Sequence, residues 1–282
     1  MNQANKYAIA VTKENVDSRA PIVFRGDIER CADLAKQYGY DAIEIQMRDP
    51  EKMNVESVKK ICDERGLGIS GIATGMEYTM NGYSMIDDDP IKRKAAVERF
   101  REYIAVGKIW NCSVVFGLLR GVLPDGADKD YYYRRLCDDL GDVLKTAEKE
   151  NVTIVTEAMN IYCTNWINTV AENVQFIKDI GSPALKLHID THHMNIDEDN
   201  MRCPVYCGAP YLGYVHLADG NRLYPGGGCI DYLTFMKDVM ETGYDGYYSV
   251  ECVPTPSQEA CAKHAITYIK HLEAAIRSLP QK

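Results

Sequence analysis

The sequence contains no long apolar run, although hydrophobic residues make up 46% of its 282 residues. A membrane-spanning helix needs roughly 18 or more consecutive apolar residues, and none of the apolar stretches approaches that length. The N-terminal segment also lacks the apolar core of a secretory signal peptide. These absences predict a cytoplasmic protein that has no membrane partner.

Clustered positive charge is absent as well. The chain carries 32 Lys and Arg residues against 41 Asp and Glu residues, which gives a formal net charge of −9. Proteins that bind nucleic acid through its phosphates gather Lys and Arg into patches. The acidic balance therefore predicts that nucleic acid is not a partner.

The ten cysteines form neither a disulfide framework nor a zinc motif. They are scattered over a long chain, and several, such as Cys31 and Cys252, lie in predicted helices or strands, which favours free thiols in a reducing cytosol. Cys203 and Cys207 have a spacing loosely like that of zinc ligands, but no second pair completes a structural site.

What the sequence does contain is a regular alternation of short apolar runs with longer amphipathic segments. We predict strands over residues 7–12, 42–46, 68–74, 113–116, 153–157, 185–189, 214–216 and 247–252. We predict helices over about 27–38, 54–65, 90–108, 129–150, 165–180, 230–241 and 257–278. A long polar and aromatic loop at 75–89 and a less regular segment at 198–211 complete the pattern.

This alternation, with no linker anywhere, predicts a single domain over residues 1–282 that forms a closed parallel (β/α)8 TIM barrel. An open, doubly wound sheet is the alternative. Such sheets often bind dinucleotides through a Gly-x-Gly-x-x-Gly turn after the first strand. The sequence lacks that turn, so the closed barrel is favoured.

Four predicted strands carry a ligand-type residue near their C-terminal ends, namely Glu157, Asp190, His216 and Glu251. A carboxylate at the end of an apolar strand is costly to bury unless a positive group meets it. Because C-terminal strand ends converge at one mouth of a barrel, we predict one divalent-metal site there. The oxygen-rich set suits Mn²⁺, Mg²⁺ or Co²⁺, with Zn²⁺ as a further option. The alternative for each carboxylate is a buried ion pair, and His188 is predicted to be a hydrogen-bonded core histidine.

The chemistry that such a site predicts is proton transfer on a sugar. A metal in the mouth can hold the carbonyl and a neighbouring hydroxyl and stabilise an enediolate. Glu157 and Glu251 are the candidate bases, one on each side of the mouth. His193 and Arg222 are candidate contacts to substrate oxygens, the alternatives being a loop-stabilising histidine and a solvated arginine. Trp166 either offers its ring face to sugar C–H groups or belongs to the core.

Three segments carry a resemblance to a known family. They are Asp190-Thr-His-His-Met-Asn-Ile, His216-Leu-Ala-Asp-Gly-Asn-Arg222 with Pro-Gly-Gly-Gly shortly after it, and the strand end at Glu251. They resemble the xylose-isomerase-like sugar phosphate isomerase/epimerase family, and within it the ketose 3-epimerases. By itself the glycine run indicates only backbone packed close to a ligand or a loop.

The resemblance implies a role for each candidate residue. The implied metal ligands are Glu157, Asp190, His216 and Glu251. Glu157 and Glu251 are implied to be the acid/base pair, and His193 and Arg222 to contact a small sugar substrate. The implied cofactor is a divalent metal, Mn²⁺ foremost or Co²⁺, and the implied assembly is a homo-oligomer or a complex with a second subunit.

The sequence departs from that family at one position. The epimerases carry an acidic substrate contact six residues after the first glutamate, where this chain has Cys163. A contact to a substrate hydroxyl is therefore absent or replaced. The same family includes catalytic subunits of C-glycoside deglycosidases, lyases that abstract a proton from a 3-oxo-glucoside and eliminate an aglycone. The predicted function is thus a metal-dependent isomerase or epimerase, with such a lyase as an alternative and a non-catalytic barrel or partner subunit as another.

Overall fold

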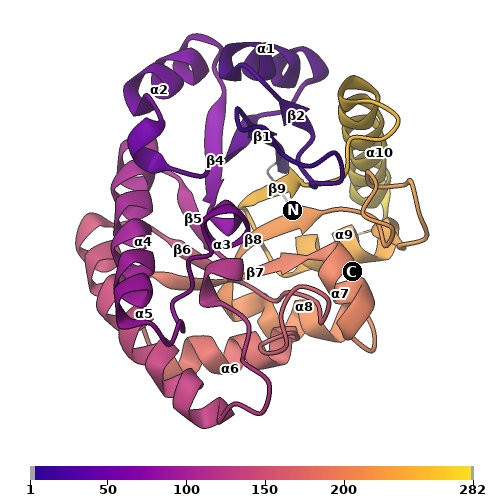
Figure 1. Ribbon diagram of the computed structural model, residues 1–282. Helices are drawn as coiled ribbons and strands as arrows, with labels where there is room; N and C mark the ends of the chain where they lie inside the picture. The colour runs from indigo at the N-terminus through magenta and orange to yellow at the C-terminus, as the bar shows by residue number, and fades with distance from the viewer. Residues whose placement is uncertain (1–3, 281–282) are drawn as a thin grey trace.

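Parallel strands close into a barrel in this computed structural model, which describes residues 4–280 (Figure 1). The barrel strands are β1 (Lys6–Thr12), β3 (Ala42–Gln46), β4 (Gly68–Ala73), β5 (Ser113–Phe116), β6 (Ile154–Glu157), β7 (Leu185–Asp190), β8 (Leu212–Leu217) and β9 (Tyr247–Val250). Each pairs with the next, and β1 pairs with both β3 and β9, which closes the ring. A two-residue strand, β2 (Phe24–Arg25), lies beside β1. The predicted (β/α)8 fold is confirmed.

The longer helices surround the barrel, whereas the short α3 (Gly75–Asn81) lies over its centre (Figure 1). The other helices are α1 (Ile28–Tyr38), α2 (Val55–Glu64), α4 (Pro90–Trp110), α5 (Lys129–Glu150), α6 (Val170–Ile180), α7 (Thr191–Asp197), α8 (Arg202–Gly208), α9 (Tyr232–Glu241) and α10 (Gln258–Ser278). Short 3-10 turns η1 (Pro50–Lys52), η2 (Leu118–Arg120) and η3 (Ala209–Tyr211) connect them. None of the helices in the described part of the chain has the length and apolar character needed to cross a membrane.

Local capping explains where several helices begin. The Asp89 side chain accepts a hydrogen bond from the backbone of Ile91, and Pro90 occupies the first turn of α4. The helix therefore begins at residue 90, as predicted. Thr169 and Glu172 form a capping box at the start of α6. The helix predicted from 165 therefore begins five residues later, at Val170.

Two segments near the barrel mouth differ from the prediction. The segment 75–89 is not all loop, because Gly75–Asn81 forms α3, which lies over the centre of the barrel in Figure 1. A helix that we did not predict, α7, follows β7 directly. It begins there because the Asp190 carboxylate accepts a hydrogen bond from the backbone N–H of His192. A candidate metal ligand thus also caps the helix that carries His193.

The interior of the barrel is partly polar. The large apolar core contrasts with a separate, small apolar cluster formed by Ala73, Val115, Val155 and Tyr214 of the barrel strands. Glu44 of β3 bonds Tyr214 and His216 of β8. Since β1 and β9 separate β3 from β8 in the ring, these bonds cross the interior. TIM-barrel interiors are usually filled by branched apolar residues. The hydrogen-bonded polar groups of Glu44, Tyr214 and His216 are therefore a distinctive feature of the chain.

Candidate active site at the barrel mouth

The four residues predicted as metal ligands lie together at the C-terminal mouth. Glu157 and Asp190 end β6 and β7, His216 lies near the end of β8, and Glu251 follows β9. Nδ1 of His216 lies 4.0 Å from Glu157 Oε1, 3.7 Å from Asp190 Oδ2 and 3.4 Å from Glu251 Oε2. None of the four is more than 8% exposed. Their coming together is what convergent strand ends predict.

The guanidinium of Arg222 balances part of the negative charge of the three carboxylates. The guanidinium of Arg222 donates to Asp190 Oδ2 at 2.6 Å and also to Glu251 Oε2. Burial opposes ionisation of Asp190, but the charge of Arg222 outweighs it and holds the pKa of Asp190 well below its usual range. Glu157 has no such bond to Arg222, and its burial, with the charges of Asp190 and Glu251, raises the pKa of Glu157 to about 8.

The imidazole of His216 has a different environment on each side of its ring. Nε2 lies 2.7 Å from Glu44 Oε2, whereas Nδ1 faces the three mouth carboxylates and finds no hydrogen-bond partner within residues 4–280. Burial by itself lowers the pKa of His216, but the charges of Glu44 and Glu251 outweigh it and raise the pKa well above its usual range. A buried nitrogen without a partner, aimed at carboxylates that attract positive charge, fits a cation site.

Within the described residues, three overlapping sets of side chains have ligand atoms close enough to hold one metal ion. They are Glu157–His188–His216, Glu44–His216–Glu251 and Glu157–Asp190–His193. In each set the ligand atoms lie within 4.8 Å of one another. Every predicted ligand belongs to at least one set, so the donor chemistry of this mouth suits a divalent cation.

His193 is held in one tautomer by the loop after β6. The backbone N–H of Asn160 donates to His193 Nδ1 at 3.3 Å, so the proton of the neutral ring is on Nε2. Nε2 lies 3.6 Å from Glu157 Oε1 and 3.8 Å from Asp190 Oδ2. Burial lowers the pKa of His193 to about 3, so the ring is neutral at physiological pH. His193 can therefore act as a hydrogen-bond donor through Nε2.

These side chains border a cavity of about 600 Å³. Its lining includes the predicted residues Glu157, Cys163, His193, His216, Arg222 and Glu251. The cavity is also lined by apolar residues, namely Val16, Ala20, Pro21, Ile22, Met76, Met80, Leu118 and Met159. Asp190 is fully buried behind this surface. A cavity lined by both charged and apolar side chains suits an amphipathic small molecule such as a sugar.

Trp166 does not contribute to the cavity wall. Its side chain is 1% exposed and belongs to the core, and its ring N–H donates to the backbone oxygen of Gly121 at 2.9 Å. Thr164 donates to the same oxygen. The prediction that Trp166 binds substrate is therefore wrong for this structure, since a proximity in sequence to strand β6 did not reveal that the loop turns the ring inward.

The glycine run after β8 packs around a carboxylate of its own loop, which agrees with the loop option that the sequence leaves open. Asp219 is fully buried, and its side chain accepts hydrogen bonds from the backbones of Gly220, Gly226 and Ile230. A Cβ added at Gly228 would lie 2.2 Å from Asp219 Oδ1. This loop places Arg222, whose φ of +63° lies in the left-handed region, which L residues rarely adopt.

Three polar residues of the site were missed in the sequence. Glu44 supports His216, Gln46 donates to Glu251 Oε1 at 2.5 Å, and Asp219 organises the glycine loop. A signal for Glu44 was present, because a carboxylate in the apolar strand 42–46 is as costly to bury as those at the strand ends. For Gln46 and Asp219 the sequence offers no comparable signal.

Two further buried groups lie near the mouth without hydrogen-bond partners in the described range. Neither ring nitrogen of His188 has one, so the prediction of a hydrogen-bonded core histidine is wrong in that respect. Its ring instead packs edge-on against Tyr214 and His216. The guanidinium of Arg120 is also unbonded, and burial lowers the pKa of Arg120 to about 10, against the opposing effect of the Glu157 charge.

The fold and the mouth together define a TIM barrel with a carboxylate–histidine site at the C-terminal ends of its strands. The chain belongs to the family described as xylose isomerase-like TIM barrel, whose sequence profile matches residues 32–272.

Proteins of known identity that are similar to this chain carry epimerase names. A ketose 3-epimerase of Arthrobacter globiformis is 28% identical over 215 residues, which cover 75% of this chain and 72% of the relative. An L-ribulose 3-epimerase of Methylomonas sp. (strain DH-1) is 30% identical over 227 residues, 77% of this chain and 75% of the relative. The solved structure of an L-ribulose 3-epimerase superposes with a TM-score of 0.84 at 24% identity, covering 99% of this chain and 100% of that one.

The packing around Asp219 generates a stability prediction. Gly228→Ala should lower the free energy of unfolding by about 1–3 kcal/mol, because the new methyl group forces the loop away from the buried carboxylate. Gly141→Ala in α5 is the control, since a Cβ there meets no atom within 4 Å. Urea unfolding of both variants measures the difference, and equal midpoints would show that the loop accommodates a side chain at 228.

Proposed function

We propose that this protein is a divalent-metal-dependent sugar isomerase or epimerase that acts on a keto-sugar through an enediolate, within the single domain predicted over 1–282. The observation that carries the proposal is the buried Nδ1 of His216, which has no hydrogen-bond partner within residues 4–280 and faces Glu157, Asp190 and Glu251 at 3.4–4.0 Å. The epimerase names of the relatives support the reaction class.

The residues present fit a divalent cation. Glu157, Asp190, His216 and Glu251 would hold it, and Mn²⁺ suits this hard set well, as do Co²⁺ and Mg²⁺. The bound cation would polarise the substrate carbonyl and stabilise the negative charge that develops when the neighbouring carbon loses its proton.

The side chains around that position supply the remaining chemistry. Glu157 and Glu251 come from β6 and β9, on different sides of the mouth, so one can remove a proton from one face of the substrate and the other can return it to the opposite face. The Nε2–H of His193 and the guanidinium of Arg222 would bind substrate oxygens. The apolar lining residues Met76 and Leu118 would exclude water from the reacting carbon.

The alternatives from the sequence are less well supported. Elimination from a 3-oxo-glycoside would begin with the same proton abstraction, but the relatives are named for epimerisation. A non-catalytic barrel does not account for the buried carboxylates, because burying them without a function is costly. We therefore place the substrate among free or substituted keto-sugars.

Metal content tests the cation site directly. Purified protein should bind about one Mn²⁺ per chain, and a hundredfold excess of Mn²⁺ over its dissociation constant should stabilise the fold by about 2.7 kcal/mol. Asp190→Asn should abolish both effects. Asp238→Asn, which also removes a buried carboxylate, lies in α9 and should bind normally. Elemental analysis and melting curves with and without EDTA measure the outcome, and a wild type indifferent to every divalent metal would exclude the site.

Isotope exchange tests the proton transfer. In D₂O with Mn²⁺ and a panel of ketoses, the protein should incorporate deuterium at one carbon of its substrate. Glu157→Gln and Glu251→Gln should each lower turnover by about 10² or more, a typical effect of losing a positioned acid or base. Glu77→Gln, a buried carboxylate bonded to Tyr103, is the control. Metal content is measured in each variant, and full activity of both metal-loaded glutamine variants would refute the mechanism.

Cys163 tests the substrate class. This side chain lines the cavity at the position where the ketose 3-epimerases carry an acidic contact. If free ketohexoses lack that contact here, Cys163→Glu should raise kcat/KM on them by about 3- to 10-fold, the effect of one added hydrogen bond. Cys163→Ser is the matched control with a short hydroxyl. A wild type as active on fructose as the glutamate variant would show that the contact is not needed.

A further inference from the structure

We propose that Glu44, held in place by Tyr214 and Ser70 inside the barrel, is the positioning residue that aims Nδ1 of His216 at the cation site. This inference rests on the proposed function, because it assumes that His216 is a cation ligand. It adds a residue from a strand, β3, that contributes none of the four proposed ligands.

The first argument is the geometry of the imidazole. Glu44 Oε2 lies 2.7 Å from Nε2 of His216. A carboxylate accepts hydrogen bonds, so Nε2 carries the proton that it donates to Glu44. A cation that displaces the second proton of the ring then meets the lone pair of Nδ1, which faces Glu157, Asp190 and Glu251. A carboxylate on the far side of a ligating histidine fixes its tautomer and ring orientation.

The second argument is that Glu44 is itself fixed. The Tyr214 hydroxyl donates to Glu44 Oε2 at 2.9 Å, and the Ser70 hydroxyl lies 2.7 Å from the Tyr214 oxygen. Because Tyr214 uses its proton for Glu44, its oxygen accepts from Ser70. Glycine at 71 leaves room for this arrangement, since a Cβ there would lie 3.2 Å from the Tyr214 hydroxyl. Ser70, Tyr214, Glu44 and His216 thus form one hydrogen-bonded column.

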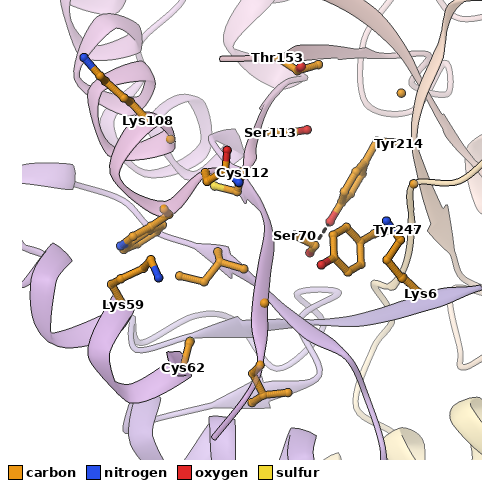
Figure 2. A pocket seen from close by; sticks show the side chains of 18 of the residues that line it. Lys6, Lys59, Cys62, Ser70, Lys108, Cys112, Ser113, Thr153, Tyr214 and Tyr247 are labelled. Carbon is orange, nitrogen blue, oxygen red and sulfur yellow. Dashed lines mark hydrogen bonds between the residues drawn. The ribbon is translucent and has the colours of Figure 1, made fainter. Parts of the chain in front are cut away.

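The column ends at a second cavity of about 600 Å³ on the N-terminal side of the barrel. Figure 2 shows the bond between Ser70 and Tyr214 at this cavity, with Tyr247 and Lys6 beside it. Tyr214 therefore lies between the two ends of the barrel. Its hydroxyl faces Glu44 within the barrel, while its ring borders the opposite cavity, so the position of Glu44 depends on packing far from the mouth.

The third argument is energetic. A fully buried carboxylate that bonds a histidine and a tyrosine is costly compared with the branched apolar residues that usually fill a TIM barrel. Glu44, Tyr214 and His216 are each at most 1% exposed. Such a network is retained where it fixes the geometry of a side chain. The side chain at the end of this network is His216, a proposed ligand.

The test measures Mn²⁺ affinity of the substrate-free protein by calorimetry and by electron paramagnetic resonance of free Mn²⁺. Glu44→Gln should weaken binding by about 10- to 100-fold, the usual effect of losing such a support. Tyr214→Phe should weaken it by about 3- to 10-fold, the effect of one hydrogen bond. Both variants should reduce the rise in melting temperature on adding Mn²⁺, which a purely structural role would leave unchanged.

Each variant has a matched control. Glu77→Gln alters a fully buried carboxylate that also accepts from a tyrosine, and Tyr248→Phe removes a buried hydroxyl that has no bonding partner within residues 4–280. Both controls should bind Mn²⁺ as wild type does. If Glu44→Gln does not fold, Tyr214→Phe, which removes one oxygen atom, decides the question.

The outcomes separate this inference from the function on which it rests. If the wild type binds Mn²⁺ and the column variants bind it within twofold of wild type, or lose no more affinity than their controls, the positioning role is overturned and the proposed function stands. If the wild type binds none of Mn²⁺, Co²⁺, Mg²⁺ and Zn²⁺, the proposed function fails and this inference fails with it.

Discussion

Repulsion among three buried carboxylates is the constraint on which the mouth of this barrel depends. Glu157, Asp190 and Glu251 all lie within 4.0 Å of Nδ1 of His216, where water screens their charges little. Positive charge must meet them, and Arg222 supplies it to two of the three. Glu157 has no hydrogen bond to Arg222, and its burial beside the other two carboxylates raises its pKa. The cluster is therefore arranged to attract a cation, and the attraction is strong because the carboxylates are buried.

That cluster is supported from two directions by residues that do not line the cavity. On one side Asp219 gathers the backbone of the loop after β8 around its carboxylate, which holds Arg222 in a left-handed conformation. On the other side Glu44 fixes the ring of His216 from inside the barrel. Capping by Asp190 adds a third link, since it begins the helix that carries His193. The positions of the charged groups at the mouth thus depend on hydrogen bonds to the backbone and on buried hydrogen bonds behind the cavity.

Sequence patterns were least informative for loop residues, which can either line the cavity or pack against the rest of the protein. The segment 75–89 was expected to be a loop, but its first seven residues form α3 over the mouth. For Trp166 the sequence left a place in the cavity wall and a place in the core open, and its ring is buried with its N–H bonded to Gly121. The glycine run indicated backbone packed close to a ligand or a loop, and it packs around Asp219 of its own loop. In each case the residue type restricted the options, and long-range contacts selected one.

The sequence by itself determined the alternation of strands and helices and hence the barrel, because the period of apolar residues depends only on local backbone geometry. It also determined which strand ends carry Glu157, Asp190, His216 and Glu251, since those strand ends must converge in a closed barrel. Only the tertiary structure decided what meets them. Glu44 and His216 are 172 residues apart and on strands that are not neighbours, so no local pattern relates them. Their bond exists because closure of the ring brings opposite strands face to face.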